Sequence, residues 1–144
     1  MKKYVLGFAF SSDGKRVVLI EKTKPEFLKG LWNGVGGKIE EYDETPAHAM
    51  EREFWEETGV KLTGWSNMFF IDNPENEYQM WVYFALDDRI NECRTTTEEK
   101  VSIVNVEHLD MYKLSRNVQW FIHFVLSASV SFKLPINVLD QGGD

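Results

Sequence analysis

The amino-acid sequence predicts an α+β fold, and the order of its elements favours an α/β sandwich with a mixed β-sheet between two helices. Residues 4–10 and 16–20 are β-rich runs that flank the turn-forming sequence Ser-Ser-Asp-Gly, so they predict a β-hairpin. Residues 46–58 have the periodicity of an amphipathic helix. Further strand-like runs then precede a second helical pattern. Periodicity alone gives only the α+β class, and the alternation of strands and helices gives the sandwich.

The bulk properties are those of a soluble globular protein. The chain has 144 residues, of which 43% are apolar and 27% are charged, and we expect residues 1–144 to form one domain. Residues 40–57 hold eight acids against Arg52 alone, which equals the net charge of −7 of the whole chain. The remainder is therefore neutral overall. No basic stripe is present to hold a nucleic-acid backbone, so a nucleic-acid polymer is not an expected partner.

Cysteine content and hydropathy restrict the location of the protein. Cys93 is the only cysteine, which excludes a disulfide framework and a thiolate metal cage within one chain. We therefore expect a reducing cytoplasm. No run approaches the roughly 20 apolar residues of a membrane span, so we expect no membrane association.

The first helix has clear start and stop signals. The Thr45 hydroxyl can cap free backbone N–H groups, and Pro46 loses nothing at the first helical position. Gly59 marks the end, because glycine tolerates the positive φ at which helices finish. Four residues share one face that we expect to be buried: Ala47, Met50, Phe54 and Thr58.

Three acids occupy one edge of this helix. Glu53, Glu56 and Glu57 stand at positions i, i+3 and i+4, and no lysine relieves their repulsion. Arg52 lies one turn before Glu56 and can orient a carboxylate with two hydrogen bonds. A hard divalent cation would relieve the repulsion, and Mg²⁺ combines a few carboxylate oxygens with water and phosphate ligands. This pattern predicts a metal site, and the alternative is a solvated acidic face.

Glycines just upstream favour the metal site over the solvated face. Gly34, Gly36 and Gly37 can adopt backbone angles that other residues cannot, which would let a main-chain carbonyl or N–H approach a metal or phosphate closely. The alternative for these glycines is a simple tight turn.

Residues 37–60 resemble the Nudix box, G-x5-E-x7-R-E-U-x-E-E-x-G-U, in which U is a bulky aliphatic residue. The second half matches closely from Arg52 to Val60, with Phe54 at one U position. The first half departs from the pattern, because six residues rather than five separate Gly37 from Glu44, and a strict count ends at Asp43. We interpret Glu44 as the box residue, since this register preserves the spacing into the helix and a loop absorbs one extra residue easily.

The resemblance implies an α/β/α sandwich and the hydrolysis of a nucleoside diphosphate linked to a group X. It implies Mg²⁺ or Mn²⁺ as cofactor, held by Glu53, Glu56, Glu57 and the carbonyl of Gly36, with Arg52 orienting the carboxylates. A loop glutamate often joins this site in the family as ligand or base. Glu98 and Glu99 are the candidates here, and Glu99 is preferred because it is nearer the following strand.

Candidate substrate contacts come from several segments. The sequence W-N-G-x-G-G-K resembles family members that hydrolyse oxidised purine nucleoside triphosphates, which implies a base-holding role for Asn33 and makes Lys38 a further candidate. Asn117 corresponds by the same resemblance to a residue that reads the purine edge, although this chain lacks the acidic pair that those enzymes can show here. The ordinary alternatives are a turn-forming Asn33 and a first-turn Asn117.

Lys22, Lys24 and Lys29 could each meet a phosphate, and we take Lys24 as the candidate, whereas the ordinary alternative is a solvated loop. Tyr78, Trp81 and Phe84 could stack on a base, and we take Tyr78 as the candidate, whereas the ordinary alternative is a core aromatic.

The remaining segments are predicted as follows. Residues 62–71 and 78–86 are strands joined by a turn, 87–100 form a mobile loop, and 101–106 form a strand. Ser115 caps a helix over residues 116–129, and His123 is packed within it rather than acting as a ligand. Its buried stripe is Val118, Phe121, Ile122, Val125 and Leu126, widened by Trp120 and Phe124. A tail from about residue 130 holds a short strand and a frayed end.

Three functions remain open, and the oligomeric state, monomer or homodimer, is open as well. Hydrolysis of a nucleoside triphosphate to monophosphate and pyrophosphate is the leading prediction. An ADP-ribose or dinucleotide pyrophosphatase is the nearest alternative, since members with that activity tend to carry a proline about fifteen residues past the box, and Pro74 falls one short. A non-catalytic nucleotide-sensing module is disfavoured, because such chains usually lose box carboxylates.

Overall fold

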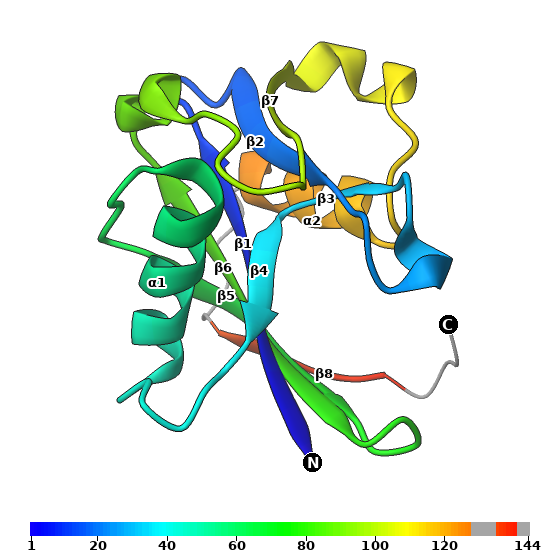
Figure 1. Cartoon of the computed structure of the whole chain (residues 1–144). Coiled ribbons are helices and arrows are strands. Elements are labelled where there is room, and N and C mark those ends of the chain that lie inside the picture. Colours follow the sequence, from blue (N-terminus) through cyan, green and yellow to red (C-terminus); the bar gives the residue numbers. More distant parts are fainter. Residues whose placement is uncertain (128–134, 141–144) are drawn as a thin grey trace.

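The computed structural model describes residues 1–127 and 135–140. Within these ranges the chain forms an eight-stranded mixed sheet with α1 on one side and α2 on the other (Figure 1). The strands are β1 (Lys2–Phe10), β2 (Arg16–Glu21), β3 (Trp32–Asn33), β4 (Val35–Lys38), β5 (Ser66–Asn73), β6 (Tyr78–Leu86), β7 (Val101–Asn105) and β8 (Ile136–Leu139). The helices are α1 (Pro46–Thr58), α2 (Val118–Leu126) and the short 3-10 helices η1 (Glu26–Leu28), η2 (Asp88–Glu92) and η3 (Val106–Met111).

The sheet is organised around β1. Its main path runs β3-β2-β1-β6-β5-β8, with β4 also paired to β1 and β7 to β2. β1 and β6 are parallel over their whole length, whereas the predicted pairs β1–β2 and β5–β6 are antiparallel. β4 pairs antiparallel with the first half of β1. The predicted mixed sheet between two helices is therefore confirmed.

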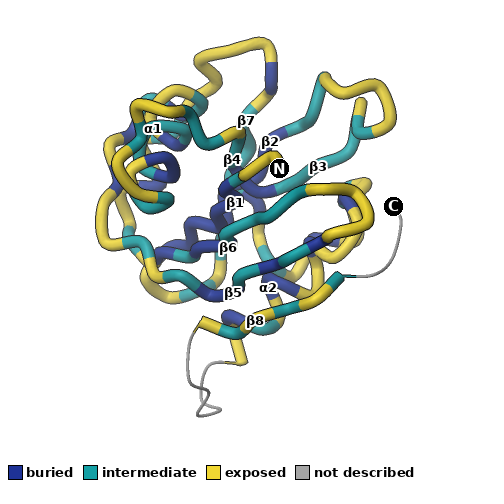
Figure 2. The backbone as a smooth tube through the Cα atoms, turned by 90° about the horizontal axis from the view of Figure 1, so that it is seen from below, coloured by how far each residue is buried: buried dark blue, intermediate teal, exposed yellow. Residues whose placement is uncertain are grey.

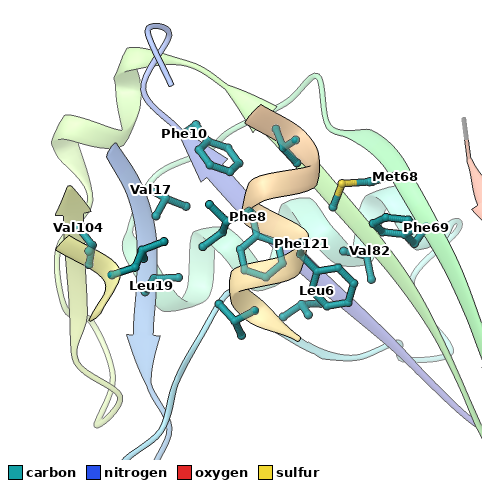
Figure 3. Packing of buried hydrophobic residues seen from close by; sticks show 14 of the residues in the cluster. Leu6, Phe8, Phe10, Val17, Leu19, Met68, Phe69, Val82, Val104 and Phe121 are labelled. Carbon is teal, nitrogen blue, oxygen red and sulfur yellow. The ribbon is translucent and has the colours of Figure 1, made fainter. Parts of the chain in front are cut away.

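Both faces of the central strands are buried, because alternate side chains enter different cores. Val5 and Ala9 of β1 pack under α1, whereas Phe8 and Phe10 face α2. The core on the α2 side contains a cluster of aromatic rings, with Phe121 of α2 5.8 Å from Phe8 between ring centroids (Figure 3). Figure 2 colours the backbone by burial and shows buried residues on the central strands and exposed residues on the outer turns.

α1 begins and ends at the predicted residues. The Thr45 hydroxyl accepts a hydrogen bond from the His48 backbone N–H at 3.1 Å, and Gly59 closes the helix with φ of 77°. Three of the four residues predicted on the buried face are buried, and Ala47 is half-buried. Ala49 is also buried. This packing fixes which edge of α1 carries the glutamates.

The glycine-rich segment is a strand and neither a turn nor a phosphate loop. Gly36 and Gly37 belong to β4, and none of the three glycines has a positive φ. They are required for close packing instead: a Cβ on Gly36 would lie 2.0 Å from the Val5 carbonyl oxygen, and one on Gly34 would lie 2.6 Å from that of Gly7. The predicted use of unusual backbone angles is therefore wrong.

The strand predicted from residue 62 begins later, at Ser66. Leu62 is buried beneath α1, and its carbonyl accepts a hydrogen bond from the Trp65 indole at 2.9 Å. Gly64 between them has φ of 78°. These residues therefore form an irregular connection that reaches the core, which explains why they resemble a strand in hydrophobicity.

α2 differs from the prediction in its start and in its exposed face. It begins at Val118 with Asn117 as the N-cap at φ of 70°, whereas Ser115 lies outside the helix and does not cap it. His123, Trp120 and Leu126 are exposed, so the buried stripe is narrower than predicted. The predicted end at residue 129 lies outside the described residues.

The remaining predictions hold in part. Residues 87–100 lack a strand or α-helix as predicted, but they include η2 and bury Ile90, and hydrogen bonds tie them to α1. The predicted short C-terminal strand is β8, and residues 141–144 lie outside the described part. Within the described ranges, neither α-helix has the length and hydrophobicity that crossing a bilayer requires.

Candidate active site

The three glutamates of α1 differ in exposure although they share one edge of the helix. The Glu53 side chain is 13% exposed and that of Glu56 is 43% exposed, while Glu57 is half-buried. Gly37 of β4 lies directly against the Glu53 carboxyl, since a Cβ there would be 2.5 Å from it. β4 therefore forms one wall of the site, and a side chain at residue 37 would displace Glu53.

Arg52 organises the first part of the site. Its Nε and Nη2 donate to the two oxygens of Asp43 at 2.9 and 2.8 Å. Its Nη1 donates to Glu53 at 2.9 Å and to Glu56 at 3.2 Å, and Nη2 also donates to the Lys38 carbonyl at 3.2 Å. One guanidinium thus joins the end of β4, the following loop and two of the helical glutamates.

The partner of Arg52 in the loop is Asp43 and not Glu44. The Asp43 side chain is 4% exposed and also accepts a hydrogen bond from the Glu40 backbone N–H at 2.8 Å. The Glu44 side chain is 83% exposed, and one of its carboxylate oxygens lies 3.7 Å from the His48 imidazole. Our interpretation of Glu44 as the box residue is therefore wrong: the strict count from Gly37 holds, and the extra residue follows Asp43.

Burial and like charge perturb the acids of the site. Burial raises the pKa of Glu53 to about 7, because it outweighs the hydrogen bond from Arg52, and the charges of Glu56 and Glu57 add to the effect. Burial likewise raises the pKa of Glu57, with the charge of Glu99 contributing. Asp43 behaves oppositely, since the Arg52 hydrogen bonds hold its pKa below its ordinary value. Glu53 is thus an acid that titrates close to neutral pH.

The loop before β7 adds Glu99 to this region. Glu99 is buried, and its Oε1 accepts from the Lys22 Nζ at 3.2 Å while its Oε2 accepts from the Thr23 backbone N–H at 2.9 Å. Glu98 is exposed and lies 3.9 Å from Lys24. Of the two candidate loop glutamates, Glu99 is the inward one, and both of its oxygens already have partners.

The acids have the chemistry of a divalent metal site without being arranged as one. Within residues 1–127 and 135–140, no three Asp, Glu, His or Cys side chains converge closely enough to form a ready-made site. Hard oxygen donors are nevertheless present, and Glu53, Glu56, Glu57 and Glu99 are close enough to perturb one another electrostatically. A bound cation would relieve this repulsion, so the residues fit a divalent metal.

A cavity of about 390 Å³ opens next to the glycine wall. It is bordered by β1, β4, β6 and the segment before β3, and it is mainly apolar, with Phe27, Leu28 and Met80 in its lining. The predicted substrate residues Asn33 and Tyr78 both line it. Gly36 and Gly37 line it as well, so the cavity and the glutamates meet at β4.

The other predicted substrate residues lie elsewhere. Asn117 lines a second cavity of about 330 Å³ between α2 and β8. Lys24 and Lys38 are exposed, and neither is among the residues that line the two cavities. Lys22 lines the first cavity in place of Lys24. The structure therefore brings Asn33 and Tyr78 together but not the two lysines or Asn117.

Several residues of the site escaped the sequence analysis. Phe27 and Leu28 resemble an ordinary loop in sequence, and they reach the cavity because η1 turns them toward β4. Met80 lines the cavity together with Tyr78, which lies two residues earlier on the same face of β6. Thr97 donates a hydrogen bond to Glu57 at 3.0 Å. The strict count of five residues from Gly37 would have identified Asp43. No feature of the sequence indicated the contact of Thr97 with Glu57.

Comparison with known proteins identifies the family. Residues 2–125 match the NUDIX domain. The chain belongs to the Nudix family. A dihydroneopterin triphosphate diphosphatase of Haemophilus influenzae is 30% identical over 114 residues, which cover 74% of this Nudix chain and 69% of the relative. The predicted enzyme class, a hydrolase of phosphoric anhydride bonds, is confirmed by this relationship.

Solved structures share the Nudix fold. A structure from work on MutT of Aliivibrio salmonicida and Vibrio cholerae superposes with a TM-score of 0.72 at 21% identity, over 88% of this chain and 98% of the other. The NUDIX domain of Shewanella oneidensis NrtR, complexed with ADP ribose, superposes with a TM-score of 0.75 at 18% identity, over 89% and 88%. At these identities the comparison shows the fold alone.

The Asp43–Arg52 pair gives a first prediction. An unfolded Asp has a pKa of about 3.9, and the folded value is lower, so the ionised carboxylate stabilises the protein above about pH 4 and this stabilisation is lost as the pH falls further. We expect Asp43→Asn to lower the free energy of unfolding by about 1–3 kcal/mol at pH 7, and less below pH 4. Urea unfolding between pH 3 and 7 measures this. Glu44→Gln is the matched control and should keep the stability of the parent. If it lost as much stability as Asp43→Asn, Glu44 would again be a candidate for the box residue.

Glu53 gives a second prediction with the opposite sign. Its folded pKa lies above the unfolded value, so the folded state holds a proton between about pH 4.5 and 7 and loses stability as the pH rises through that range. In metal-free buffer, we expect Glu53→Gln to be more stable than the parent above pH 7 by on the order of 3 kcal/mol, and equal to it near pH 4. Thermal unfolding in EDTA measures the difference. Glu51→Gln is the control and should show the same dependence of stability on pH as the parent. If Glu53→Gln also showed the parent's dependence, the pKa of Glu53 would not be raised by burial in the folded protein.

Proposed function

We propose that this Nudix hydrolase cleaves a nucleoside diphosphate linked to a group X with Mg²⁺ or Mn²⁺, and that a nucleoside triphosphate, hydrolysed to monophosphate and pyrophosphate, is the leading substrate. One observation carries the proposal. The edge of α1 with its three glutamates adjoins, across Gly36 and Gly37, an apolar cavity lined by Asn33. A phosphate chain and a flat ring would thus find suitable surroundings next to each other.

The metal ligands in this proposal are Glu53, Glu56, Glu57 and the carbonyl of Gly36, with Glu99 as a further candidate. A divalent cation held there would neutralise the diphosphate charge and make water a stronger nucleophile at neutral pH. Arg52 supports the arrangement, because its hydrogen bonds orient Glu53 and Glu56 while Asp43 holds the guanidinium in place.

Glu53 is the residue that we propose as proton acceptor. In the metal-free protein burial raises the pKa of Glu53 to about 7, and a carboxylate held against β4 beside the other helical glutamates could accept the proton of the attacking water. Glu99 is the second candidate for this step. Its carboxylate would first have to exchange its hydrogen bonds with Lys22 and Thr23, so the observed contacts favour Glu53.

The cavity suits a flat heteroaromatic ring. Its apolar lining can enclose such a ring, Tyr78 offers an aromatic face, and Asn33 offers polar atoms for the ring edge. The Haemophilus relative acts, by its name, on a triphosphate that carries a bicyclic pterin ring. This supports a triphosphate with a bicyclic ring as substrate, a purine nucleotide or a related compound.

An ADP-ribose or dinucleotide pyrophosphatase is the alternative within the family. Pro74 lies in the turn between β5 and β6, fourteen residues past Val60. The NrtR domain with the same fold binds ADP ribose. A sensing module without turnover is less favoured, because Glu53, Glu56, Glu57 and Arg52 are all present.

Product analysis separates these functions. The protein should be incubated with excess Mg²⁺ or Mn²⁺ and a panel of nucleoside triphosphates, oxidised purines, dihydroneopterin triphosphate, ADP-ribose and dinucleotides. Release of pyrophosphate from a triphosphate supports the leading proposal. AMP with a sugar phosphate supports the alternative, and binding by calorimetry without any product supports the sensing module.

Glu57 gives the prediction that tests the metal site. We expect Glu57→Gln to lower kcat/KM on the best substrate by on the order of 100-fold or more, because an amide oxygen replaces a charged metal ligand. Glu51→Gln is the matched control, since Glu51 lies on the same helix outside the proposed ligand set, and it should retain the parent rate. Turnover near the parent rate in Glu57→Gln would show that Glu57 is not a ligand.

A further inference from the structure

Glu57 differs from the other two helical glutamates in what holds it. Arg52 donates hydrogen bonds to Glu53 and Glu56. Among the described residues, the one hydrogen bond to the Glu57 carboxylate comes from the Thr97 hydroxyl, which donates to Oε2 at 3.0 Å. The orientation of Glu57 therefore depends on a loop that is forty residues away in sequence and not on the arginine of its own helix.

The direction of the Thr97 hydroxyl is fixed by a second contact. Its oxygen accepts a hydrogen bond from the Glu99 backbone N–H at 3.1 Å. A hydroxyl has a single proton to donate, and here the Glu99 contact occupies a lone pair on the oxygen. The proton is thereby left for Glu57. Thr97 acts on one oxygen of the carboxylate, and Oε1 accepts no hydrogen bond from any residue within the described ranges.

Residues 94–99, which we call the clasp, are attached to the end of α1. The Arg94 backbone N–H donates to the Thr58 carbonyl at 3.0 Å, and the Thr96 hydroxyl donates to the Glu56 carbonyl. These carbonyls belong to the last turn of α1, where helical partners are missing. The clasp thus satisfies the helix end and carries Thr97 to the Glu57 side chain.

The other end of the clasp is attached to the wall of the cavity. Glu99 accepts hydrogen bonds from Lys22 and from the Thr23 backbone N–H, and Lys22 lines the cavity. The clasp therefore connects the carboxylates of α1 with the segment that borders the proposed substrate site. Its position depends on contacts at both ends.

We propose that Thr97 is a positioning residue for Glu57, holding the carboxylate by Oε2 so that Oε1 is left free to bind a divalent cation. This inference rests on the proposed function, in which Glu57 is a metal ligand. Partners of this kind, which touch the ligand and not the metal, commonly contribute about 10- to 100-fold to metal affinity. Because Thr97 is exposed, we expect an effect at the lower end of this range.

The experiment measures Mn²⁺ binding to the substrate-free protein by isothermal titration calorimetry. Thr97→Val removes the hydroxyl at nearly constant shape and should weaken Mn²⁺ binding about 10-fold. Thr97→Ser keeps a hydroxyl and should restore the affinity to within about twofold of the parent. Thr95→Val is the matched control for the loop, because the Thr95 hydroxyl accepts from the Val101 backbone N–H at 2.9 Å and does not contact a carboxylate.

Kinetics provide the second readout. In Thr97→Val, the Mn²⁺ concentration for half-maximal activity should rise about 10-fold, while kcat at saturating Mn²⁺ stays within about threefold of the parent. A general loss of structure would lower kcat at every metal concentration, and thermal unfolding of each variant shows whether this occurs.

The outcomes separate the two proposals. If the parent binds Mn²⁺ and turns over substrate but Thr97→Val binds the ion as tightly, the role of Thr97 is overturned and the proposed function stands. Equal weakening in Thr95→Val and Thr97→Val also overturns it, because the effect would then belong to the loop as a whole. A parent protein that binds no Mn²⁺ would overturn both proposals.

Discussion

The contact on which the site depends is the one between Arg52 and Asp43. The two side chains meet through paired hydrogen bonds, with Asp43 almost fully covered. This contact joins the loop that follows β4 to the first half of α1. With the guanidinium fixed in this way, its remaining N–H groups reach Glu53 and Glu56. The pair thus sets both the path of the loop and the orientation of two carboxylates.

Around this contact the fold places acidic side chains in partly buried positions. Glu53 lies between α1 and β4, and Glu57 lies beneath the clasp. Such an arrangement opposes folding in the absence of a counter-ion, because buried acids prefer to be neutral. The two cores on either side of the sheet supply the stability that tolerates it. A bound cation would offset this cost to folding.

Local patterns made much of the fold predictable. The boundaries of α1 followed from Thr45, Pro46 and Gly59, which act through short-range hydrogen bonds and backbone angles. Strand pairing within hairpins followed in the same way. By contrast, β4 resembled a turn, because its glycines serve contacts with β1 that are distant in sequence. Ser115 resembled a helix cap, but the chain enters α2 through the positive φ of Asn117.

The site was predictable where it lies on one element and not where it joins several. The spacing of Glu53, Glu56 and Glu57 identified a shared edge because a helix has a fixed period. Whether Asp43 or Glu44 pairs with Arg52 depends on which of the two side chains the loop directs inward. Counting back from the helix indicated Glu44, whereas the inward residue is Asp43. The contacts of Thr97 and Lys22 depend on how distant loops meet. The spacing of residues in the sequence does not indicate which distant loops come into contact.

The glycines at residues 34, 36 and 37 have a consequence for how this enzyme can diversify. Residues 34, 36 and 37 face backbone or carboxylate at distances that admit no larger residue, so this wall cannot change without loss of the strand or of Glu53. The cavity is also lined by Phe27 and Leu28 of η1, and Phe27 is 70% exposed, so that side of the cavity has room for other side chains. New ligand preferences in relatives of this chain should therefore arise by exchange on that side, with the glycine side held constant.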